Sequence, residues 1–593
     1  MKVDVFLIQL ESSVFLDNSI YNLGLLSIAT VLKNSGYSVK PLMTQHFLEL
    51  SFADRIKLFK ESSPSIVGFN VNSDNIHKVA YMAEEIKKVL PSVYIVVGGP
   101  YPSIKKEEVL KKYDCFDFSS VGEGEFTILS LCRLLIGEKP TKDKKYHLDT
   151  KQNGFEDIAG LVYRKNGEVI YNPRIPFIEN LDVLPPADYS MPDISTPFLY
   201  SSGRGCPFAC AFCSQGVHAR GYRAFDPKRV IDDLMNGMKN RNTSSFNIAD
   251  DTFIANKKRA EEICAYLAEK RKTKDFIFCC EGRVDIFDKN PDLIDTLYRG
   301  GLRNIQLGIE NGNQKILDLY RKKITLEQVE RVVSNIYNHG DIMIISNFII
   351  GGPIENQETL ENTFDFALKL LNLAPGLFEF NVPFLCPYPG TEIALNPEKF
   401  GLKIIDDEWV KTMTIDSPSC VTPQLDKNTL YFRKVNFLNA LRSNMRDICE
   451  SLPYEVIEFH FKLLKHGVLT RYYNMILSNV DSLMKWFRFR NYMNSVRLSE
   501  VKTQEIKNLK CARTTGKILE NGNYNITGWF SDVILSDPKE KYIYDLSSGK
   551  FTLSEIADKF SKKFNISEHE SFSNYILPFF KKLEKTFHIS FFR

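Results

Sequence analysis

The sequence predicts an α/β protein of several domains, in which two regions of alternating strands and helices precede a mainly helical C-terminal third. The chain has 593 residues, which is too long for one hydrophobic core. Its composition, 44% hydrophobic and 25% charged, is that of a globular protein. Short runs rich in Val, Ile and Phe alternate with amphipathic stretches up to about residue 415, which is typical of parallel sheets covered by helices.

Charge and hydropathy exclude several classes of partner. The 76 basic and 73 acidic residues leave a net charge of +3, too small to attract nucleic acid or an anionic membrane surface. Met1–Leu10 has no basic start or cleavage site of a secretory signal, and no apolar run approaches the roughly twenty residues of a membrane span. Most of the twelve cysteines stand singly in apolar runs, as reduced thiols do. We therefore expect a cytoplasmic protein.

Residues 1–140 predict a flavodoxin- or Rossmann-like domain. Its expected strands are Val3–Leu10, Tyr37–Leu42, Ile66–Val71, Tyr94–Val97 and Phe116–Val121, and its helices are Leu23–Asn34, Asn75–Val89 and Glu125–Leu135. The first helix should stop at Gly36, because glycine readily adopts the left-handed conformation of a helix end. Ligands of such sheets bind beyond the carboxyl ends of the strands, where this sequence is rich in glycine.

Three interpretations of this domain compete. A phosphorylated receiver domain needs acidic residues after its first and third strands, where Asn70 and Asn72 stand instead. A dinucleotide-binding domain needs GxGxxG after its first strand, and no such motif is present there. Thirdly, Leu23–Ala29, Val67–Phe69 and Val97–Pro100, followed by Val121–Gly122–Glu123–Gly124–Glu125, resemble in order and spacing the cobalamin-binding domain of class B radical S-adenosylmethionine (SAM) enzymes.

This resemblance implies cobalamin contacts at Leu23, Gly24, Asn72, Ser73, Gly98, Gly99, Pro100, Gly122, Glu123, Gly124 and Glu125. The domain lacks the DxHxxG motif that supplies an axial histidine in some cobalamin proteins. His46, His77 and His147 lie in other contexts, and we interpret them as surface residues. Bound cobalamin is therefore expected without a histidine lower ligand.

Residues 141–195 predict a linker, which leads to a cysteine motif. The linker contains a strand pair, Gly160–Tyr163 and Val169–Tyr171, joined by an Asn-Gly turn. Cys206, Cys210 and Cys213 follow in the spacing CxxxCxxC. Three thiolates can hold three irons of a [4Fe–4S] cluster and leave the fourth iron open to a substrate.

Zinc is the alternative occupant of the cysteine motif, with His218 as a fourth ligand. The motif, with aromatic Phe212 before its last cysteine, resembles the signature of radical SAM enzymes. That resemblance implies that SAM binds the open iron and receives one electron in its sulfonium group.

Residues 196–415 predict a partial (β/α)6 barrel with its chemistry at the carboxyl ends of the strands. The expected strands are Leu199–Gly203, Phe246–Ala249, Phe276–Cys279, Ile305–Ile309, Ile342–Ile350 and Phe378–Leu385. The expected helices are Pro227–Met238, Lys257–Arg271, Pro291–Tyr298, Leu326–Tyr337 and Leu360–Leu373. The resemblance implies SAM contacts at Phe212, Asp250, Asp251, Glu281, Arg283, Glu310, Gly351 and Gly352. The alternative role for each polar residue is a helix cap or a salt bridge at the barrel rim.

The C-terminal third predicts a helical region, residues 416–530, and a small winged-helix-like domain, residues 531–593. Long helices are expected at Asn428–Glu450 and Tyr454–Asn494, the second packing on its aromatic residues. The last domain should contain a strand at Tyr542–Tyr544, a turn at Ser547–Gly549, a helix Leu553–Phe560 capped by Thr552, a helix Phe572–Leu583 and a strand His588–Phe592. It is similar to PqqD-like domains that bind leader peptides; the alternative is generic packing.

Across residues 1 to about 400, the resemblance implies reductive cleavage of SAM to a 5′-deoxyadenosyl radical and C-methylation by methylcobalamin. The implied substrate is a peptide, as in the maturation of ribosomally made peptides, or another natural product, and the implied reductant is a flavodoxin or ferredoxin. One alternative is a radical SAM enzyme that forms rings, rearranges or epimerises without methyl transfer. The other is a non-catalytic, zinc-bearing scaffold that binds peptides.

Overall fold

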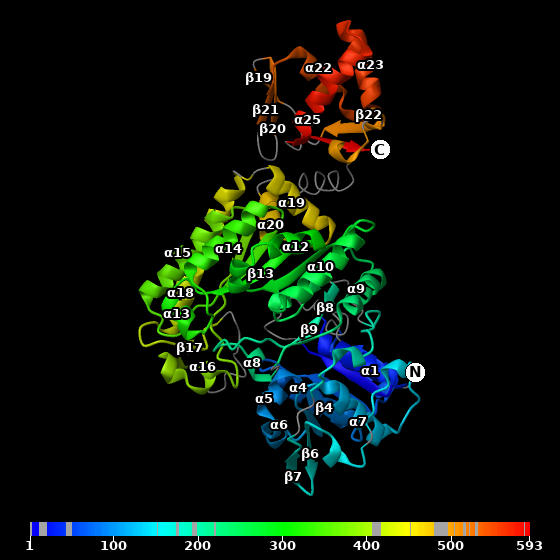
Figure 1. The fold of residues 1–593 in the computed structure, drawn as a ribbon, viewed down its shortest axis with the longest axis vertical. Coiled ribbons are helices and arrows are strands. Elements are labelled where there is room, and N and C mark those ends of the chain that lie inside the picture. Colours follow the sequence, from blue (N-terminus) through cyan, green and yellow to red (C-terminus); the bar gives the residue numbers. More distant parts are fainter. Residues whose placement is uncertain are drawn as a thin grey trace. The chain divides into compact units, whose positions relative to one another are not determined.

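The chain forms two compact units, Met1–Arg442 and Ser443–Arg593 (Figure 1). The computed structural model describes residues 3–10, 21–42, 50–150, 152–173, 177–191, 198–218, 221–405, 417–450, 452, 454–478, 496–502, 505–513, 518–520, 522–527, 532–585 and 588–592. The first unit contains both sheets that the sequence predicts, and each unit is described by itself below.

The N-terminal sheet has the strand order β2-β1-β3-β4-β5-β6-β7. Its strands are β1 (Val5–Gln9), β2 (Val39–Leu42), β3 (Ile66–Asn70), β4 (Tyr94–Gly98), β5 (Phe118–Ser120), β6 (Leu161–Lys165) and β7 (Glu168–Tyr171). Its helices are α1 (Leu23–Asn34), α3 (Phe52–Ser62), α4 (Ile76–Val89), α5 (Pro100–Lys105), α6 (Glu107–Lys112) and α7 (Gly124–Ile136). The five predicted strands are confirmed and pair in parallel. Helices α3, α5 and α6 were not predicted.

Local residues explain where α1 begins and ends. The Asn22 side chain accepts a hydrogen bond from the Leu25 amide at 2.9 Å and so caps the start of the helix. Gly36 has φ +86°, and a Cβ atom there would collide with the Pro140 carbonyl, so the residue that follows the helix must be glycine.

The strand pair predicted in the linker is part of the N-terminal sheet. β6 pairs antiparallel with β5, and β7 pairs antiparallel with β6. Asn166 and Gly167, both at positive φ, form the turn between β6 and β7, as their sequence predicts. The sheet therefore continues past residue 140 to Tyr171, because the β6–β7 hairpin pairs with the free edge of β5.

The second sheet of the first unit is the predicted partial barrel. Its six strands are all parallel in the order β15-β14-β13-β12-β11-β8. They are β8 (Phe198–Tyr200), β11 (Ser245–Ile248), β12 (Ile277–Gly282), β13 (Leu302–Glu310), β14 (Met343–Phe348) and β15 (Phe378–Asn381). The five predicted helices correspond to α9 (Pro227–Arg241), α10 (Lys257–Arg271), α12 (Leu293–Gly300), α14 (Leu326–His339) and α15 (Gln357–Leu373). Shorter elements are β9 (Gly203–Arg204), β10 (Arg223–Ala224), α8 (Gln215–His218), α11 (Val284–Lys289), α13 (Gln314–Leu319), α16 (Glu392–Leu395), β16 (Lys403–Ile404) and β17 (Cys420–Val421).

The two faces of the barrel sheet differ in chemistry. The face toward the helices is buried and apolar, as at Phe246 and Phe278, whose rings stack with centroids 5.6 Å apart. Along β11, β13 and β14 the residues that alternate with this face are more accessible and include amides, at Asn247, Gln306 and Asn347. The inner face of the barrel sheet therefore carries polar side chains beside apolar ones such as Ile345.

The long helices of the C-terminal third differ from the prediction. α18 (Lys427–Glu450) confirms the first helix. The second is not continuous, because α19 (Tyr454–Lys465) ends before Gly467, which has φ +80°, and α20 (Arg471–Ser478) begins after it. Tyr472 and Tyr473 are buried, as expected for a helix that packs on its aromatic residues. The basic and aromatic run 485–490 lies outside the described residues.

The second unit ends in a small α+β core. Its strands are β18 (Lys510–Arg513), β19 (Ile518–Glu520), β20 (Asn523–Thr527), β21 (Asp532–Leu535), β22 (Ser548–Thr552) and β23 (Ile589–Phe592). They form two three-stranded sheets, β22-β18-β23 and β19-β20-β21. The main helices are α22 (Pro538–Leu546), α23 (Leu553–Phe564) and α25 (Leu577–Lys585), the last preceded by a π-helical turn at Ser571–Ile576.

Two predictions for this region are wrong. Tyr542–Tyr544 lies in helix α22, which Asp537 caps and Pro538 starts, rather than in a strand. The predicted turn Ser547–Gly549 overlaps β22. The capped helix after Thr552 and the final strand are confirmed. Because β18 pairs with β22 and β23, the small domain also begins before residue 531.

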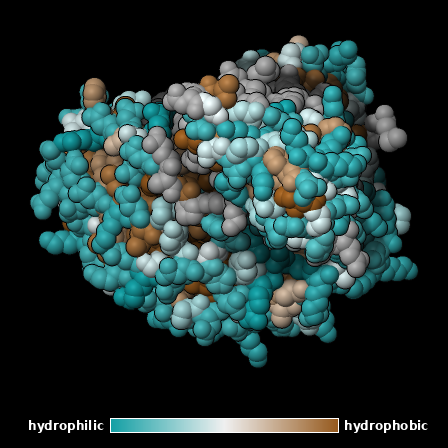
Figure 2. Space-filling view, turned by 90° about the horizontal axis from the view of Figure 1, so that it is seen from above, coloured by the Kyte–Doolittle hydropathy of each residue, from teal (hydrophilic) through white to brown (hydrophobic). Residues whose placement is uncertain are grey.

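The surface is mainly polar in the view of Figure 2, where hydrophobic residues form only small patches between hydrophilic ones. Among the described residues, no helix is both long enough and apolar enough to cross a membrane.

Candidate active site

A cavity of 710 Å³ lies where the carboxyl ends of the N-terminal strands meet the start of the barrel. Its wall includes the last residues of three strands, Asn70 of β3, Gly98 of β4 and Ser120 of β5. The barrel side contributes Tyr200 of β8 and Arg204 of β9. The cavity is therefore at the ligand-binding edge that the sheet topology predicts.

Most of the residues predicted to contact cobalamin line this cavity. They are Leu23, Gly24, Gly98, Gly99, Pro100, Gly122, Glu123, Gly124 and Glu125. Asn72 and Ser73 are not in its wall; the Asn72 amide instead donates to the Asn75 side chain at 2.8 Å in the turn before α4. Sequence reasoning missed Phe177 and Tyr189, which lie outside the motifs. No histidine occurs among the described residues of the wall.

Glycines leave room in the cavity for a bulky ligand. A Cβ atom on Gly98 would have only Ser120 nearby, at 3.6 Å, so side chains do not fill the adjacent space. Gly99 has φ +109°, and a Cβ atom there would lie 2.7 Å from the Asn70 side chain. Glycine is therefore required at position 99 by the backbone, while at position 98 it keeps the cavity open. The site fits a large, flat cofactor such as cobalamin.

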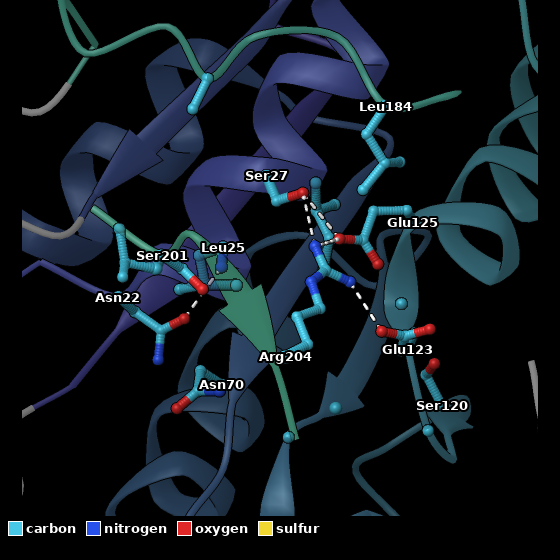
Figure 3. Close-up of a pocket in the computed structure, with 18 of the residues that line it drawn as sticks. Asn22, Leu25, Ser27, Asn70, Ser120, Glu123, Glu125, Leu184, Ser201 and Arg204 are labelled. Carbon is cyan, nitrogen blue, oxygen red and sulfur yellow. Dashed lines mark hydrogen bonds and ion pairs between the residues drawn. The ribbon is translucent and has the colours of Figure 1, made fainter. Parts of the chain in front are cut away.

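Arg204 is the centre of a charged cluster in the cavity wall, which we call the Arg204 hub and define as Arg204, Arg223, Glu123, Glu125 and Ser27. Figure 3 shows Arg204 with Ser27, Glu123 and Glu125. Its guanidinium group lies 2.6 Å from Glu125 and 2.8 Å from Glu123. Arg223 binds the second oxygen of Glu123 at 2.8 Å, and the Ser27 hydroxyl donates to Glu125 at 2.6 Å. The two glutamates predicted to contact cobalamin are thus bound to arginines of the β9–β10 hairpin.

Electrostatics keep Glu125 and Arg204 ionised although both are largely buried. Burial alone would raise the pKa of Glu125, but the charge and hydrogen bonds of Arg204, with the Ser27 hydroxyl, more than offset it and lower the pKa below its ordinary value. Burial acts in the opposite direction on Arg204, and the two glutamates again prevail, so its pKa is raised. The two residues hold each other in the charged state.

The three cysteines of the motif lie on one loop over the carboxyl ends of β11 and β12. Cys206 Sγ is 3.8 Å from the Thr252 hydroxyl, and Cys210 Sγ is 3.9 Å from a guanidinium nitrogen of Arg283. Burial, together with the neighbouring sulfurs of the other two cysteines, raises the pKa of Cys213 to about 11. A set of mutually close, partly accessible thiols suits a positively charged iron–sulfur core, which stabilises thiolates.

The alternative occupant of the motif is a single zinc ion, which needs ligands that converge on one point. No three His, Cys, Asp or Glu side chains of the described residues converge to hold one metal ion. Sulfur ligands about 2.3 Å from one zinc ion must lie close together, whereas a four-iron cluster separates its ligands further. Nothing is described of the His218 side chain, which would be the fourth zinc ligand.

The structure distinguishes the two adjacent aspartates after β11. Asp250 is buried, and its carboxylate accepts hydrogen bonds from the amides of Ser202 and Gly203 at 2.6 and 3.0 Å and from the Ser202 hydroxyl. Burial raises its pKa to about 6, although these bonds oppose the shift. Asp250 therefore fixes the chain just before the cysteine loop. Asp251 lines the cavity, and its pKa is raised by burial, so it is the aspartate available to a ligand.

Arg283 also supports the cysteine loop. Its guanidinium group stacks 3.7 Å from the ring of Phe208, between Cys206 and Cys210. It donates to the Asp285 carboxylate and the Lys322 carbonyl, both at 2.8 Å. These partners occupy the arginine that the sequence assigned to the SAM carboxylate, so the structure supports a role in positioning the loop and its Cys210 sulfur.

Glu281 and Glu310 lie near each other, but only Glu310 forms an ion pair. Lys322 Nζ contacts Glu310 Oε1 at 2.8 Å in a buried ion pair. The Glu281 side chain is exposed toward the barrel interior and makes no hydrogen bond or ion pair with another described residue. Enclosure by the barrel, followed by the negative charges of Asp251 and Glu310, raises the pKa of Glu281 to about 7. Glu281 and Asp251 are thus two carboxyl groups without a side-chain partner among the described residues.

The Gly351–Gly352 turn is held by a carboxylate that sequence reasoning did not identify as functional. Glu355 is fully buried and accepts hydrogen bonds from the amides of Gly351 and Gly352. Tyr320 lies against this turn and also forms an edge-to-face pair with Phe212, with centroids 4.9 Å apart. Phe212, which belongs to the cysteine loop, therefore connects that loop to the glycine turn through Tyr320.

Replacing Glu355 by Gln is expected to change how stability depends on pH. Burial raises the pKa of Glu355 from 4.5 to about 7, so between these values the folded protein binds more protons than the unfolded chain. Stability should then fall as pH rises through this window, by on the order of 3 kcal/mol at most. Glu355→Gln cannot titrate and should lose this part of the dependence. The midpoints of urea unfolding at pH 5 and pH 8 measure this dependence in wild type, in Glu355→Gln and in the control Glu358→Gln, which changes an exposed residue. The same change of midpoint between the two pH values in all three proteins would refute the raised pKa of Glu355.

Two family models match the chain. The Radical SAM superfamily model matches residues 200–367, and the B12 binding domain model matches residues 16–131. The chain is 30% identical over 377 residues to "Uncharacterized methyltransferase PH0819" of Pyrococcus horikoshii, covering 62% of this chain and 76% of that protein. It is 29% identical over 353 residues to the anaerobic magnesium-protoporphyrin IX monomethyl ester cyclase of Rubrivivax gelatinosus, covering 57% of this chain and 60% of that protein.

A solved structure is similar in fold. The radical S-adenosylmethionine methyltransferase TsrM of Kitasatospora setae, solved with cobalamin and a [4Fe–4S] cluster bound, superposes with a TM-score of 0.57. The likeness covers 74% of this chain and 91% of that chain at 16% sequence identity. The order of a B12-binding domain followed by a radical SAM domain is thus found both by sequence and by fold.

Proposed function

The chain belongs to the radical SAM enzymes that carry a B12-binding domain, and we propose on this basis that it is a cobalamin-dependent methyltransferase that methylates an unactivated carbon. One observation carries the proposal: the wall of the 710 Å³ cavity includes Gly203–Gly205, the residues that lead directly into Cys206. The cavity suited to cobalamin and the loop suited to the cluster are therefore neighbours in one unit. The relatives named as methyltransferases support the same activity.

The residues of the chain would hold and orient the cofactors. When bound, the cluster and SAM supply a carbon-centred radical, and cobalamin supplies the methyl group. Cys206, Cys210 and Cys213 would hold the cluster. Asp250, which binds the Gly203 amide, and Arg283, which stacks on Phe208, would hold the loop of these cysteines in position. Asp251 would contact the methionyl end of SAM. The carboxyl group of Glu281, with a pKa of about 7, could hold or release a proton at the barrel interior.

The barrel interior supports a polar substrate. The side chains of Asn247, Glu281 and Gln306 make no hydrogen bond or ion pair with other described residues. Asn381 donates to Asn347 at 3.2 Å on the adjacent strands. Amides offer both donors and acceptors, and a bound lipid would leave them unpaired at a cost in free energy. A peptide or another hydrogen-bonding natural product would therefore suit the barrel interior. A flavodoxin or ferredoxin would supply the electron.

The second unit agrees with a peptide substrate but has more than one interpretation. The similarity of its last residues to PqqD-like domains supports a peptide-binding role, and these residues belong to a small fold with a three-stranded sheet, β22-β18-β23, and helices α22, α23 and α25 around one hydrophobic core. Generic packing of the same elements remains the alternative. All twelve cysteines are free thiols, which favours the reducing cytoplasm as the place of action.

Ring formation without methyl transfer is the second candidate, because the cyclase of Rubrivivax gelatinosus is among the similar proteins. The two reactions differ in what becomes of SAM. Methyl transfer should yield S-adenosylhomocysteine together with 5′-deoxyadenosine in roughly equal amounts, because one SAM donates methyl and another supplies the radical. Cyclisation should yield 5′-deoxyadenosine alone. Chromatography of anaerobic reactions with a reductant measures both, and 5′-deoxyadenosine without S-adenosylhomocysteine would reject the methyltransferase proposal.

A further inference from the structure

The Arg204 hub lies in the cavity wall and is close in sequence to the first cysteine of the loop. Arg204 is separated from Cys206 by Gly205 alone, and Gly205 has φ +79°. On the other side of the hub, Glu123 and Glu125 flank Gly124 in the turn that follows β5 and lines the cavity. A ligand that contacts this turn therefore acts on the residues that hold Arg204 (Figure 3).

The surroundings leave Arg204 little freedom. The residues just before it, Ser202 and Gly203, are fixed by Asp250, and Arg259 donates to the Ser202 carbonyl at 2.7 Å. β9 is paired with β10, where Arg223 binds Glu123 at 2.8 Å. The Ile178 amide donates to the same carboxylate at 2.7 Å. A shift of the Glu123–Glu125 turn would therefore be transmitted to the hairpin rather than absorbed by loose side chains.

The charges of the hub come from both domains and balance. Two glutamates of the N-terminal domain face two arginines of the β9–β10 pair, at distances of 2.6 to 2.8 Å between charged atoms. Neither domain has this arrangement without the other, since a buried charge without its partner is strongly unfavourable. The hub is thus formed fully only when the turn and the hairpin both hold their positions.

We propose that the Arg204 hub is a positioning element that couples the two cofactor sites, so that cobalamin in the cavity and the cluster on the cysteine loop each strengthen the binding of the other. This inference rests on the cofactor sites of the proposed function but not on methyl transfer. Coupling between two sites is reciprocal, and its usual size is roughly 5–150-fold in affinity. Merely structural ion pairs would stabilise the fold without coupling the sites.

Hydroxocobalamin binding tests this proposal without any turnover. Its dissociation constant is measured anaerobically by titration of the full chain with the cluster reconstituted and with the cluster removed by a chelator. We expect wild type to bind at least roughly fivefold more tightly when the cluster is present. Arg204→Met should bring that ratio close to one while hydroxocobalamin and iron still bind separately.

Two further variants make the outcome decisive. Ser27→Ala removes only the hydroxyl that supports Glu125 and should lower the ratio partly, even if Arg204→Met does not fold. Arg164→Met is the matched control and should keep the wild-type ratio, because Arg164 pairs with Asp114 at 3.0 Å and does not line the cavity. A wild-type ratio of one, or an unchanged ratio in Ser27→Ala and Arg204→Met, would overturn the proposal. Coupling without S-adenosylhomocysteine in turnover would instead overturn only the methyltransferase function.

Discussion

Replacing Cys206, Cys210 and Cys213 together by alanine is expected to reduce the iron content of reconstituted protein from about four atoms per chain to none. These residues are the three thiols of one loop, and Arg283 and Thr252 lie beside two of their sulfurs. Formation of 5′-deoxyadenosine should fall below detection, because the electron that cleaves SAM comes through the cluster. Metal analysis and chromatography of the products measure the two effects.

The control for this substitution is Cys264→Ala, which removes a buried thiol from helix α10 without touching the loop. It should keep its iron and its SAM cleavage. Cobalt should be retained in the triple variant, although the hub predicts weaker binding. Iron that survives the triple substitution would show that the cluster is held elsewhere.

Replacing Gly98 by Phe is expected to weaken hydroxocobalamin binding at least a hundredfold, or about 3 kcal/mol. Gly98 and Val96 line the cavity, whereas Val97 between them belongs to the core on the opposite face of the sheet. A side chain at position 98 therefore points into the cavity, and a phenyl ring there would occupy the space that the cofactor needs. Titration followed by absorbance measures the loss.

Gly98→Ala is the matched control, because its methyl group would meet only Ser120 at an ordinary distance of 3.6 Å. It should bind hydroxocobalamin nearly as well as wild type. Both variants should load iron, since the cysteine loop is untouched. Equal affinity in the phenylalanine and alanine variants would place the cofactor outside this cavity.

The elements with a clear hydrophobic period could be predicted from the sequence. The six barrel strands and helices such as α10 follow from patterns within a few residues, and the fold that they build places the cysteines at strand ends. The β9–β10 hairpin escaped prediction because two-residue strands have no period. Tyr542–Tyr544 resembles a strand locally, but Asp537 and Pro538 start a helix before it.

Pairings between distant residues explain most of what the sequence left open at the site. Glu123 and Glu125 stand in a glycine-rich turn and were expected to face cobalamin, yet their partner Arg204 is about eighty residues away in the chain. Similarly, Asp250 and Asp251 are indistinguishable by sequence. Only the fold shows that the first binds the backbone before the cysteine loop and the second lines the cavity.

The most direct test of two adjacent cofactor sites is the iron and cobalt content of wild-type protein after anaerobic reconstitution with iron, sulfide and hydroxocobalamin. We expect about four irons and one cobalt per chain. Iron without cobalt would remove methylcobalamin from the proposed reaction, and zinc in place of iron would show that the cysteine loop holds no iron–sulfur cluster.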